Sequence, residues 1–282
     1  MRALRSGRQR LAVIFTAFAV IGVIATIALA AGSSPPKLAY TTGGTATPTG
    51  PTTAAPGPTT FVVTNTTTKD ADFTVLRLHD GADPAAVQKD IDRKLTADQI
   101  EAMPFDIVGG TGDARSGHPS SVTFTLAAGT YLVANTTSET RTPSIVLTVS
   151  GDPNGATAPA PVTTVTMHDY KYVLSRSIPR SGVVRVINKG KRIHMMIAFK
   201  AQNAAGAAKL SKALRKGDQK TVNKLIRGVG TNLDPIAPGQ TEDLAAVHYG
   251  KGSYVFACFW KSSASKGKSH ERLGMTKVIS VK

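Results

Sequence analysis

Four side chains with sulfur or imidazole groups fall in the C-terminal part of the sequence in an order that could bind a metal ion. The only cysteine, Cys258, ends a strand-like apolar run, and His270 and Met275 follow it. His194 lies upstream, in a second strand-like segment. Two imidazoles, one thiolate and one thioether suit copper better than hard cations, with the methionine as a weak axial partner. The sequence therefore predicts a single mononuclear copper site.

The order of these residues resembles that of the cupredoxins, the plastocyanin- and azurin-like blue-copper family. Three features carry the resemblance: the turn Asn188–Gly190 before the first histidine, a cysteine closing a late strand, and a His-x4-Met step before a last strand, Thr276–Val281. The resemblance covers roughly residues 161–282. It implies a β-sandwich that binds one type 1 copper ion and transfers single electrons.

The resemblance also implies a role for each candidate ligand. His194, Cys258 and His270 would be the in-plane ligands of the copper, and Met275 the axial one. The sequence departs from the family in one place, because eleven residues separate Cys258 from His270, which is more than plastocyanin-like members have.

Two functional hypotheses other than electron transfer are open. A single cysteine is often a small buried apolar residue, so the chain could be a metal-free extracellular binding or structural module with Cys258 inert. A copper-binding chain could also store or deliver the ion. The ring nitrogens of His194 and His270 and the sulfur of Cys258 should lie within about 4 Å of one another if they share a metal.

The chain contains an internal repeat. Asn65 and Gly129 recur as Asn188 and Gly252, each shifted by 123 positions (188 − 65 and 252 − 129). The flanking strand-like segments match at the same offset. Self-similarity at a fixed offset predicts a tandem repeat of one structural unit.

The first copy lacks the candidate ligands. Ala71 stands at the position of His194, and Asn135 at that of Cys258. Its last strand-like segment, Ser144–Val149, follows a loop without a His or Met counterpart. The first copy is therefore expected to be the same sandwich without metal, so the fold does not require these side chains.

Short segments rich in β-branched and aromatic residues, separated by Gly, Pro and Asn, predict an all-β chain. With the repeat, they predict two tandem Greek-key β-sandwiches of cupredoxin type. Each copy also carries a short helical insertion, Pro84–Met103 in the first and Ala204–Arg227 in the second. In the second insertion, Gly217 should end one helix and Asp218 should cap the next.

The predicted organisation has five parts. One of them is the Thr/Pro/Gly-rich linker 32–60, whose near absence of charge and small apolar surface favour a flexible tether. The parts are a signal peptide or signal anchor (1–31), a linker (32–60), a cupredoxin-like domain without metal ligands (61–150), a second linker (151–161) and a copper-binding cupredoxin-like domain (162–282).

The N-terminus predicts export. Four arginines precede the uncharged apolar run Leu11–Ala31, and Ala28–Ala30 could be a signal-peptidase site. A run of about 20 apolar residues can also span a bilayer. We expect an extracellular or cell-surface protein, either released by cleavage or anchored by this segment.

Charge is divided unevenly between the copies. Residues 60–150 contain 7 basic and 11 acidic residues, a net charge of −4, whereas residues 161–282 contain 22 basic and 6 acidic residues, a net charge of +16. An acidic redox partner would be steered toward the basic copy. The cations nearest the candidate ligands are Lys261, Lys266, Lys268 and Arg272.

Other partners and activities are weaker expectations. The basic helical insertion Ala204–Arg227 could contact an anionic cell-surface polymer or membrane. Nucleic acid is not expected, because export removes the encounter and no binding motif is present. An enzyme is not expected either: the six histidines form no His-x-His pair of the kind that copper oxidases need, and no Gly-x-Ser-x-Gly motif occurs.

Overall fold

The computed structural model describes residues 33–43, 46–67, 71–93, 95–114, 119–135, 143–244 and 249–281. The chain divides into two compact units, Met1–Ala31 and Gly32–Lys282, and every described residue belongs to the second. The predicted signal or anchor segment therefore lies outside the described residues. In the part of the chain that the structure describes, no helix is long and apolar enough to cross a membrane.

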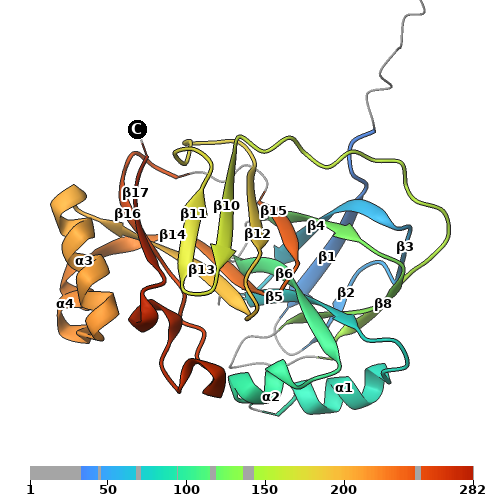
Figure 1. Ribbon diagram of the computed structural model, residues 1–282. Helices are drawn as coiled ribbons and strands as arrows, with labels where there is room; N and C mark the ends of the chain where they lie inside the picture. The colour runs from blue at the N-terminus through green and yellow to red at the C-terminus, as the bar shows by residue number, and fades with distance from the viewer. Residues whose placement is uncertain are drawn as a thin grey trace, which may run out of the picture. The chain divides into compact units, whose positions relative to one another are not determined.

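The described residues form mainly β-strands (Figure 1). The strands of the first half are β1 (Lys37–Gly43), β2 (Ala46–Thr49), β3 (Thr53–Ala54), β4 (Gly57–Asn65), β5 (Ala71–Leu78), β6 (Phe105–Ala114), β7 (Ser120–Leu126), β8 (Gly129–Asn135) and β9 (Ile145–Val149). Those of the second half are β10 (Thr163–His168), β11 (Lys171–Leu174), β12 (Val184–Asn188), β13 (His194–Ala201), β14 (Ile226–Ile236), β15 (Thr241–Leu244), β16 (Gly252–Ala257) and β17 (Thr276–Val281).

Strand pairing follows the same pattern in both halves. β4 pairs parallel with β1 and antiparallel with β7, and β12 pairs parallel with β10 and antiparallel with β15. The order β9-β8-β5-β6 in one sheet matches the order β17-β16-β13-β14 in another. β5 and β13 begin 123 positions apart (194 − 71), which is the offset of the sequence repeat. The all-β character is as expected, while two tandem Greek-key sandwiches stay an interpretation.

The two halves share a sheet. β7 of the first half pairs antiparallel with β15 of the second, so one eight-stranded sheet runs through both in the order β11-β10-β12-β15-β7-β4-β1-β2. Pairing of this kind removes two open strand edges that would otherwise expose unpaired backbone groups. That the two halves are separate domains stays a prediction.

The expectation of a flexible tether over residues 32–60 is wrong for much of its length. β1 pairs with β4 from Lys37 to Thr42. The side chain of Tyr40 is buried, and its ring stacks on Phe61 with centroids 5.6 Å apart. Composition alone misled because the few apolar residues of the segment, Tyr40 among them, are buried only when its backbone pairs with β4.

The β-branched and aromatic residues of the segment Val162–Tyr172 predict one strand from the sequence, but the structure has two, β10 and β11. β10 and β11 form a hairpin in which His168 pairs with Lys171, leaving Asp169 and Tyr170 in the turn. Tyr170 has φ of +66°, in the left-handed region that side chains other than glycine rarely adopt. This turn lies beside the candidate ligands.

Both helical insertions are present. They contain α1 (Pro84–Ile91) and α2 (Ala97–Glu101) in the first half, and α3 (Ala204–Lys216) and α4 (Gln219–Leu225) in the second. As expected, Gly217 ends α3 with φ of +70°, and Asp218 accepts a hydrogen bond from the Thr221 N–H at 3.1 Å to cap α4. The apolar face of α3 packs on β16, and its lysines and arginines are exposed.

Two carboxyl groups are buried where the halves meet. Glu242 in β15 is 0% exposed and Asp234 in β14 is 6% exposed. Gly109 and Gly110 of β6 make room for them, because a Cβ on either glycine would overlap a carboxylate oxygen. Asp234 accepts a hydrogen bond from the Thr74 hydroxyl at 3.0 Å. Burial, reinforced by the charge of Asp234, raises the pKa of Glu242 well above its ordinary value of 4.5.

Replacing Glu242 with glutamine should therefore stabilise the fold at neutral and alkaline pH. A carboxyl group with a raised pKa in the folded state lowers stability once the pH exceeds its unfolded value, here about 4.5, and the loss grows as the pH rises. Urea unfolding of Glu242→Gln at pH 8 should give a free energy of unfolding higher by on the order of 1 kcal/mol, with little change at pH 4.

The exposed Asp80 offers a matched control, since Asp80→Asn removes a carboxylate that is already solvated. It should leave the free energy of unfolding unchanged at both pH values. A Glu242→Gln protein no more stable than the parent at pH 8 would contradict the burial argument.

Candidate metal centre

Three of the four predicted ligands meet in one buried cluster. The side chains of His194, Cys258 and His270 are each 0% exposed. The Nδ1 atoms of the two histidines lie 3.0 Å apart, and the Cys258 Sγ lies 3.5 Å from Nδ1 of His270 and 3.9 Å from Nδ1 of His194. These distances meet the 4 Å criterion stated above. Within the described ranges, this is the one group of three such side chains whose ligand atoms converge.

Neighbouring strands bring His194 and Cys258 together. His194 begins β13 and Cys258 directly follows β16, and the two strands pair antiparallel with Ile197 opposite Ala257. Adjacent strands lie about 5 Å apart, so these two side chains meet at one end of the sheet. The backbone N–H of Met195 also donates to the Cys258 Sγ at 3.4 Å.

A side-chain turn fixes the segment before His194. The Asn188 Oδ1 accepts from the Gly190 N–H at 2.9 Å, and its Nδ2 donates to the Arg192 and Ile236 carbonyls at 2.8 and 2.9 Å. In the first half, Asn65 accepts from the Thr67 N–H at 2.9 Å in the same way. The turn therefore belongs to the repeated fold and does not depend on the candidate ligands.

The long loop from Cys258 to His270 is closed at its base. The His270 N–H donates to the Trp260 carbonyl at 3.0 Å, and the Glu271 N–H donates to the Cys258 carbonyl at 2.8 Å. The residues between Trp260 and His270 therefore extend away from a loop base that two backbone hydrogen bonds close. Because the base carries both ligands, the additional loop length does not separate them.

The fourth predicted ligand, Met275, is also buried. Its N–H donates to the His270 carbonyl at 2.9 Å, and its carbonyl accepts from the Cys258 N–H at 3.3 Å. Its backbone is thus tied to those of two other candidate ligands. The role of its sulfur as an axial ligand belongs to the proposal below.

The β10–β11 turn contributes two residues that the sequence analysis missed. Asp169 Oδ1 lies 3.1 Å from His194 Nε2, and the ring of Tyr170 meets that of His270 edge-on with centroids 5.1 Å apart. Gly190 permits the first contact, since a Cβ there would lie 2.5 Å from the Asp169 oxygen. An Asp-Tyr pair inside a predicted strand was the signal that could have indicated this turn.

The carboxylate of Asp169 orients the His194 ring. When Nε2 donates its proton to Asp169, the lone pair of Nδ1 points into the cluster, as metal-ligating histidines require. Burial opposes ionisation of Asp169, but hydrogen bonds from His194 and from the Lys191 N–H hold its pKa below the ordinary value. The carboxylate thus remains charged and able to accept the proton.

The cluster disfavours charge on its own ligands. Burial raises the pKa of the Cys258 thiol to about 12. Burial, together with the nearby His194, lowers the pKa of His270 to about 4. The imidazoles are therefore neutral donors, and the thiolate form needs a neighbouring cation.

The spacing of the three atoms fits one metal ion. Bonds of about 2.0 Å to nitrogen and 2.3 Å to sulfur in a near-trigonal arrangement place the nitrogens about 3.0–3.5 Å apart and each nitrogen about 3.7 Å from the sulfur. The observed distances are 3.0, 3.5 and 3.9 Å. Soft and borderline donors of this kind favour copper over magnesium or calcium.

The equivalent position in the first half has a different chemistry. Asn135 replaces Cys258, is buried, and donates from Nδ2 to the Thr42 hydroxyl at 3.2 Å. Ala71, in place of His194, offers no ligand atom. The first half therefore has no histidine or cysteine at these two positions, and its being a metal-free sandwich stays a prediction.

A helix of the first half holds the ligand loop of the second. The Trp260 indole N–H donates to Glu101 at 2.7 Å, and the Ser263 N–H donates to Asp98 at 2.7 Å. Both carboxylates belong to α2, which lies beside this loop (Figure 1). The bond from Ser263 also lowers the pKa of Asp98. These contacts join the metal-free half to the segment between Cys258 and His270.

Removing the acceptor at Glu101 should loosen this loop. Glu101→Ala leaves the indole N–H without its partner, and we expect a free energy of unfolding lower by about 1–2 kcal/mol. Because Trp260 is the only tryptophan, its emission should shift to longer wavelength as the ring becomes more exposed.

Glu101→Gln keeps an acceptor oxygen and serves as the control. It should retain most of the stability and the parent emission maximum. Equal behaviour of the alanine and glutamine variants would show that the hydrogen bond does not hold the loop.

Comparison with known proteins gives a limited result. No protein-family model matches the sequence, and no curated protein matches it. Solved structures that match part of the chain include a reduced auracyanin from Roseiflexus castenholzii (17% identity, TM-score 0.28), an azurin from Methylomonas sp. strain J (18%, 0.26) and auracyanin B (14%, 0.26). The aligned regions cover 42%, 42% and 45% of this chain and 94%, 95% and 91% of the three matched chains, in that order. Likeness at these scores does not establish the family or function of this chain.

Proposed function

We propose that this chain is an exported copper protein that carries one electron at a time through a mononuclear type 1 site. His194, Cys258 and His270 would be the in-plane ligands and Met275 the axial ligand. The observation that carries the proposal is the convergence of two Nδ1 atoms and one Sγ, 3.0–3.9 Å apart, in a fully buried cluster.

Copper, when bound, supplies reversible one-electron redox chemistry at such a donor set. The residues of the chain supply position, polarity and the exclusion of water. Asp169 orients the His194 ring, and the Met195 N–H donates to the Cys258 sulfur. Hydrogen bonds to a ligating sulfur and the burial around it are the means by which a protein sets a redox potential.

The proposal predicts stoichiometric copper binding that depends on Cys258. Titration of the metal-free protein with cupric salt should take up one ion per chain and produce an intense visible absorption from thiolate-to-copper charge transfer. Cys258→Ser should abolish that absorption, because the hydroxyl oxygen is not a soft donor.

Asn135→Ser is the matched control, since it changes the equivalent buried position of the first half. It should leave both the stoichiometry and the absorption unchanged. Absence of stoichiometric uptake by the parent protein would refute the copper site.

The alternatives give different results in the same titration. A copper store or delivery protein would take up the ion without intense colour or reversible reduction. A metal-free extracellular module would take up none, a possibility favoured by the first half, where Asn135 bonds to Thr42 in place of a ligand. We favour the electron carrier because a buried thiol facing two imidazole nitrogens has no evident structural purpose.

We propose that the fold comprises two tandem Greek-key sandwiches of cupredoxin type, of which only the second binds metal. Support comes from the matching strand order of the halves. Export, with cleavage of or anchoring by the segment Leu11–Ala31, remains part of the proposal on sequence grounds alone, as does the expectation that the chain is not an enzyme.

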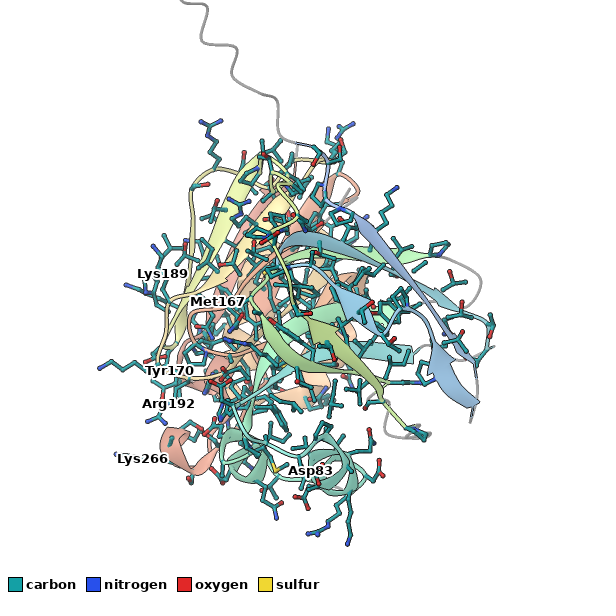
Figure 2. The ribbon with its side chains drawn as sticks, turned by 90° about the vertical axis from the view of Figure 1, so that its right-hand side faces the viewer. Asp83, Met167, Tyr170, Lys189, Arg192 and Lys266 are labelled. Carbon is teal, nitrogen blue, oxygen red and sulfur yellow. The ribbon has the colours of Figure 1, made fainter. Side chains whose placement is uncertain are left out.

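An acidic redox partner fits the charge around the site. Lys261, Lys266, Lys268 and Arg272 are exposed on or beside the ligand loop. Lys189, Arg192 and Lys266 lie along one side of the molecule with Tyr170 (Figure 2), and the Tyr170 ring contacts His270. An anionic cell-surface polymer or membrane is the alternative partner, and it would bind the basic helices α3 and α4. Nucleic acid is not expected as a partner.

Charge steering should appear in the kinetics of small redox reagents. Oxidation of the reduced copper protein by anionic ferricyanide should slow as ionic strength rises, because screening weakens attraction between exposed charges. Lys266→Glu should lower the rate constant at low salt severalfold.

The control variant is Lys224→Glu on α4, which makes the same charge change outside the ligand loop. It should have the smaller effect. Equal effects of the two variants would show that steering comes from net charge and not from the surface around the site.

A further inference from the structure

The two histidines of the candidate centre are held in different ways. Nε2 of His194 lies 3.1 Å from Asp169 Oδ1, so a hydrogen bond fixes the orientation of its ring. The Nε2 atom of His270 is also buried, but among the described residues it has no hydrogen-bond partner. The orientation of the His270 ring therefore depends on the groups that pack against it.

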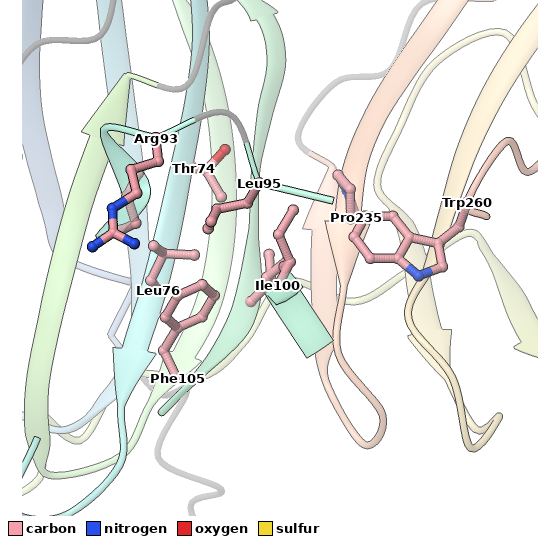
Figure 3. Close-up of a pocket in the computed structure, with 10 residues that line it drawn as sticks. Thr74, Leu76, Arg93, Leu95, Ile100, Phe105, Pro235 and Trp260 are labelled. Atoms are coloured by element: carbon pink, nitrogen blue, oxygen red, sulfur yellow. The ribbon is translucent and has the colours of Figure 1, made fainter. Parts of the chain in front are cut away.

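One aromatic side chain packs on the His270 ring. The ring of Tyr170 meets it edge-on, with centroids 5.1 Å apart and an interplanar angle of 85°. Aromatic pairs in this arrangement are stabilised beyond simple burial. Trp260, the tryptophan of the ligand loop, packs against the first half instead and lines an apolar groove there with Ile100 and Phe105 (Figure 3). The packing of His270 thus relies on the β10–β11 turn.

That turn contacts both histidines. Asp169 and Tyr170 are its two residues. The first contacts His194 and the second contacts His270. Tyr170 has φ of +66°, a conformation that residues other than glycine keep only when the surrounding structure fixes it. Its carbonyl oxygen also lies close to Gly274, where a Cβ would be 3.9 Å away. The turn therefore contacts the segment after His270 through its backbone as well as its side chain.

Tyr170 also separates the centre from solvent. The side chains of Cys258 and His270 are 0% exposed. Tyr170 is partly exposed (Figure 2) and packs on the apolar cluster that contains Cys258 and Met275. A molecule that approaches from this side meets the tyrosine ring before it meets His270, so loss of the ring should open a path to the buried ligands.

We propose that Tyr170 is a positioning residue of the metal centre, whose ring holds the His270 ring in orientation and excludes water on this side. With Asp169 on His194, the β10–β11 turn thus orients both imidazoles. The consequence for copper binding rests on the proposed function. The holding of the ring is a property of the chain itself and can be measured without metal.

Removal of the ring in the metal-free, full-length chain tests the proposal. Tyr170→Gly deletes the ring, and glycine adopts the observed backbone conformation readily, so the turn should remain. Alkylation of Cys258, the only cysteine, by iodoacetamide should become about tenfold faster, because a lost aromatic contact favours local opening. Long-range proton–nitrogen NMR spectra should show one set of His270 ring signals in the parent and broadened or multiple signals in the variant.

Two further variants are controls. Tyr170→Phe keeps the ring and should restore both properties to those of the parent. Lys171→Ala changes the next, exposed residue of the hairpin and should leave both unchanged. If Tyr170→Gly does not unfold cooperatively in urea, Tyr170→Asn replaces it, because asparagine also tolerates this backbone conformation.

The copper-loaded protein adds a separate measurement. Tyr170→Gly should keep the visible absorption that depends on Cys258 but lose copper to EDTA about tenfold faster than the parent, because the His270 ring is less well held. If the parent takes up no copper, the proposed function fails, while the two metal-free measurements still decide the role of Tyr170.

Three results would overturn the proposal. One is an unchanged alkylation rate and unchanged His270 signals in a folded variant without the ring. The second is a Tyr170→Phe protein that behaves like Tyr170→Gly. The third is an equal effect of Lys171→Ala, which would show a general loosening of the hairpin in place of a contact made by the ring.

Discussion

The candidate metal centre depends on the meeting of one thiol and two imidazole nitrogens at a position buried from solvent. Burial raises the pKa of Cys258 to about 12 and lowers that of His270 to about 4. Both side chains are therefore uncharged near neutral pH in the absence of a metal ion. A soft cation bound there would stabilise the thiolate and accept both nitrogen lone pairs. The neighbouring contacts, Asp169 on His194 and the Met195 N–H on Cys258, hold the donors in place.

The first half of the chain makes direct contacts with the second half and with its ligand loop. Its strand β7 continues the sheet of the second half, and its helix α2 holds the ligand loop through Glu101 and Asp98. Its own version of the site has Asn135 hydrogen-bonded to Thr42. The first half thus contributes two hydrogen-bond acceptors to the segment between Cys258 and His270.

Much of this could be predicted from the sequence. The offset repeat, the helical insertions and the meeting of His194, Cys258 and His270 follow from residue order, because strand ends on one sheet edge bring distant positions together. The strand β1 and the Asp169–Tyr170 turn could not. β1 is ordered by its pairing with β4 and by the burial of Tyr40 against Phe61, and Tyr170 adopts a left-handed conformation that is rare for residues other than glycine. The shared β7–β15 sheet is a contact between repeats, which carries no local signal.

X-ray absorption at the copper edge of the loaded, oxidised protein tests the central claim most directly, because it reports which atoms surround the ion. The account predicts a first shell containing one sulfur from Cys258 and two imidazole nitrogens, with the sulfur contribution lost in Cys258→Ser. A shell of only oxygen and nitrogen in the parent protein, unchanged by that substitution, would contradict it.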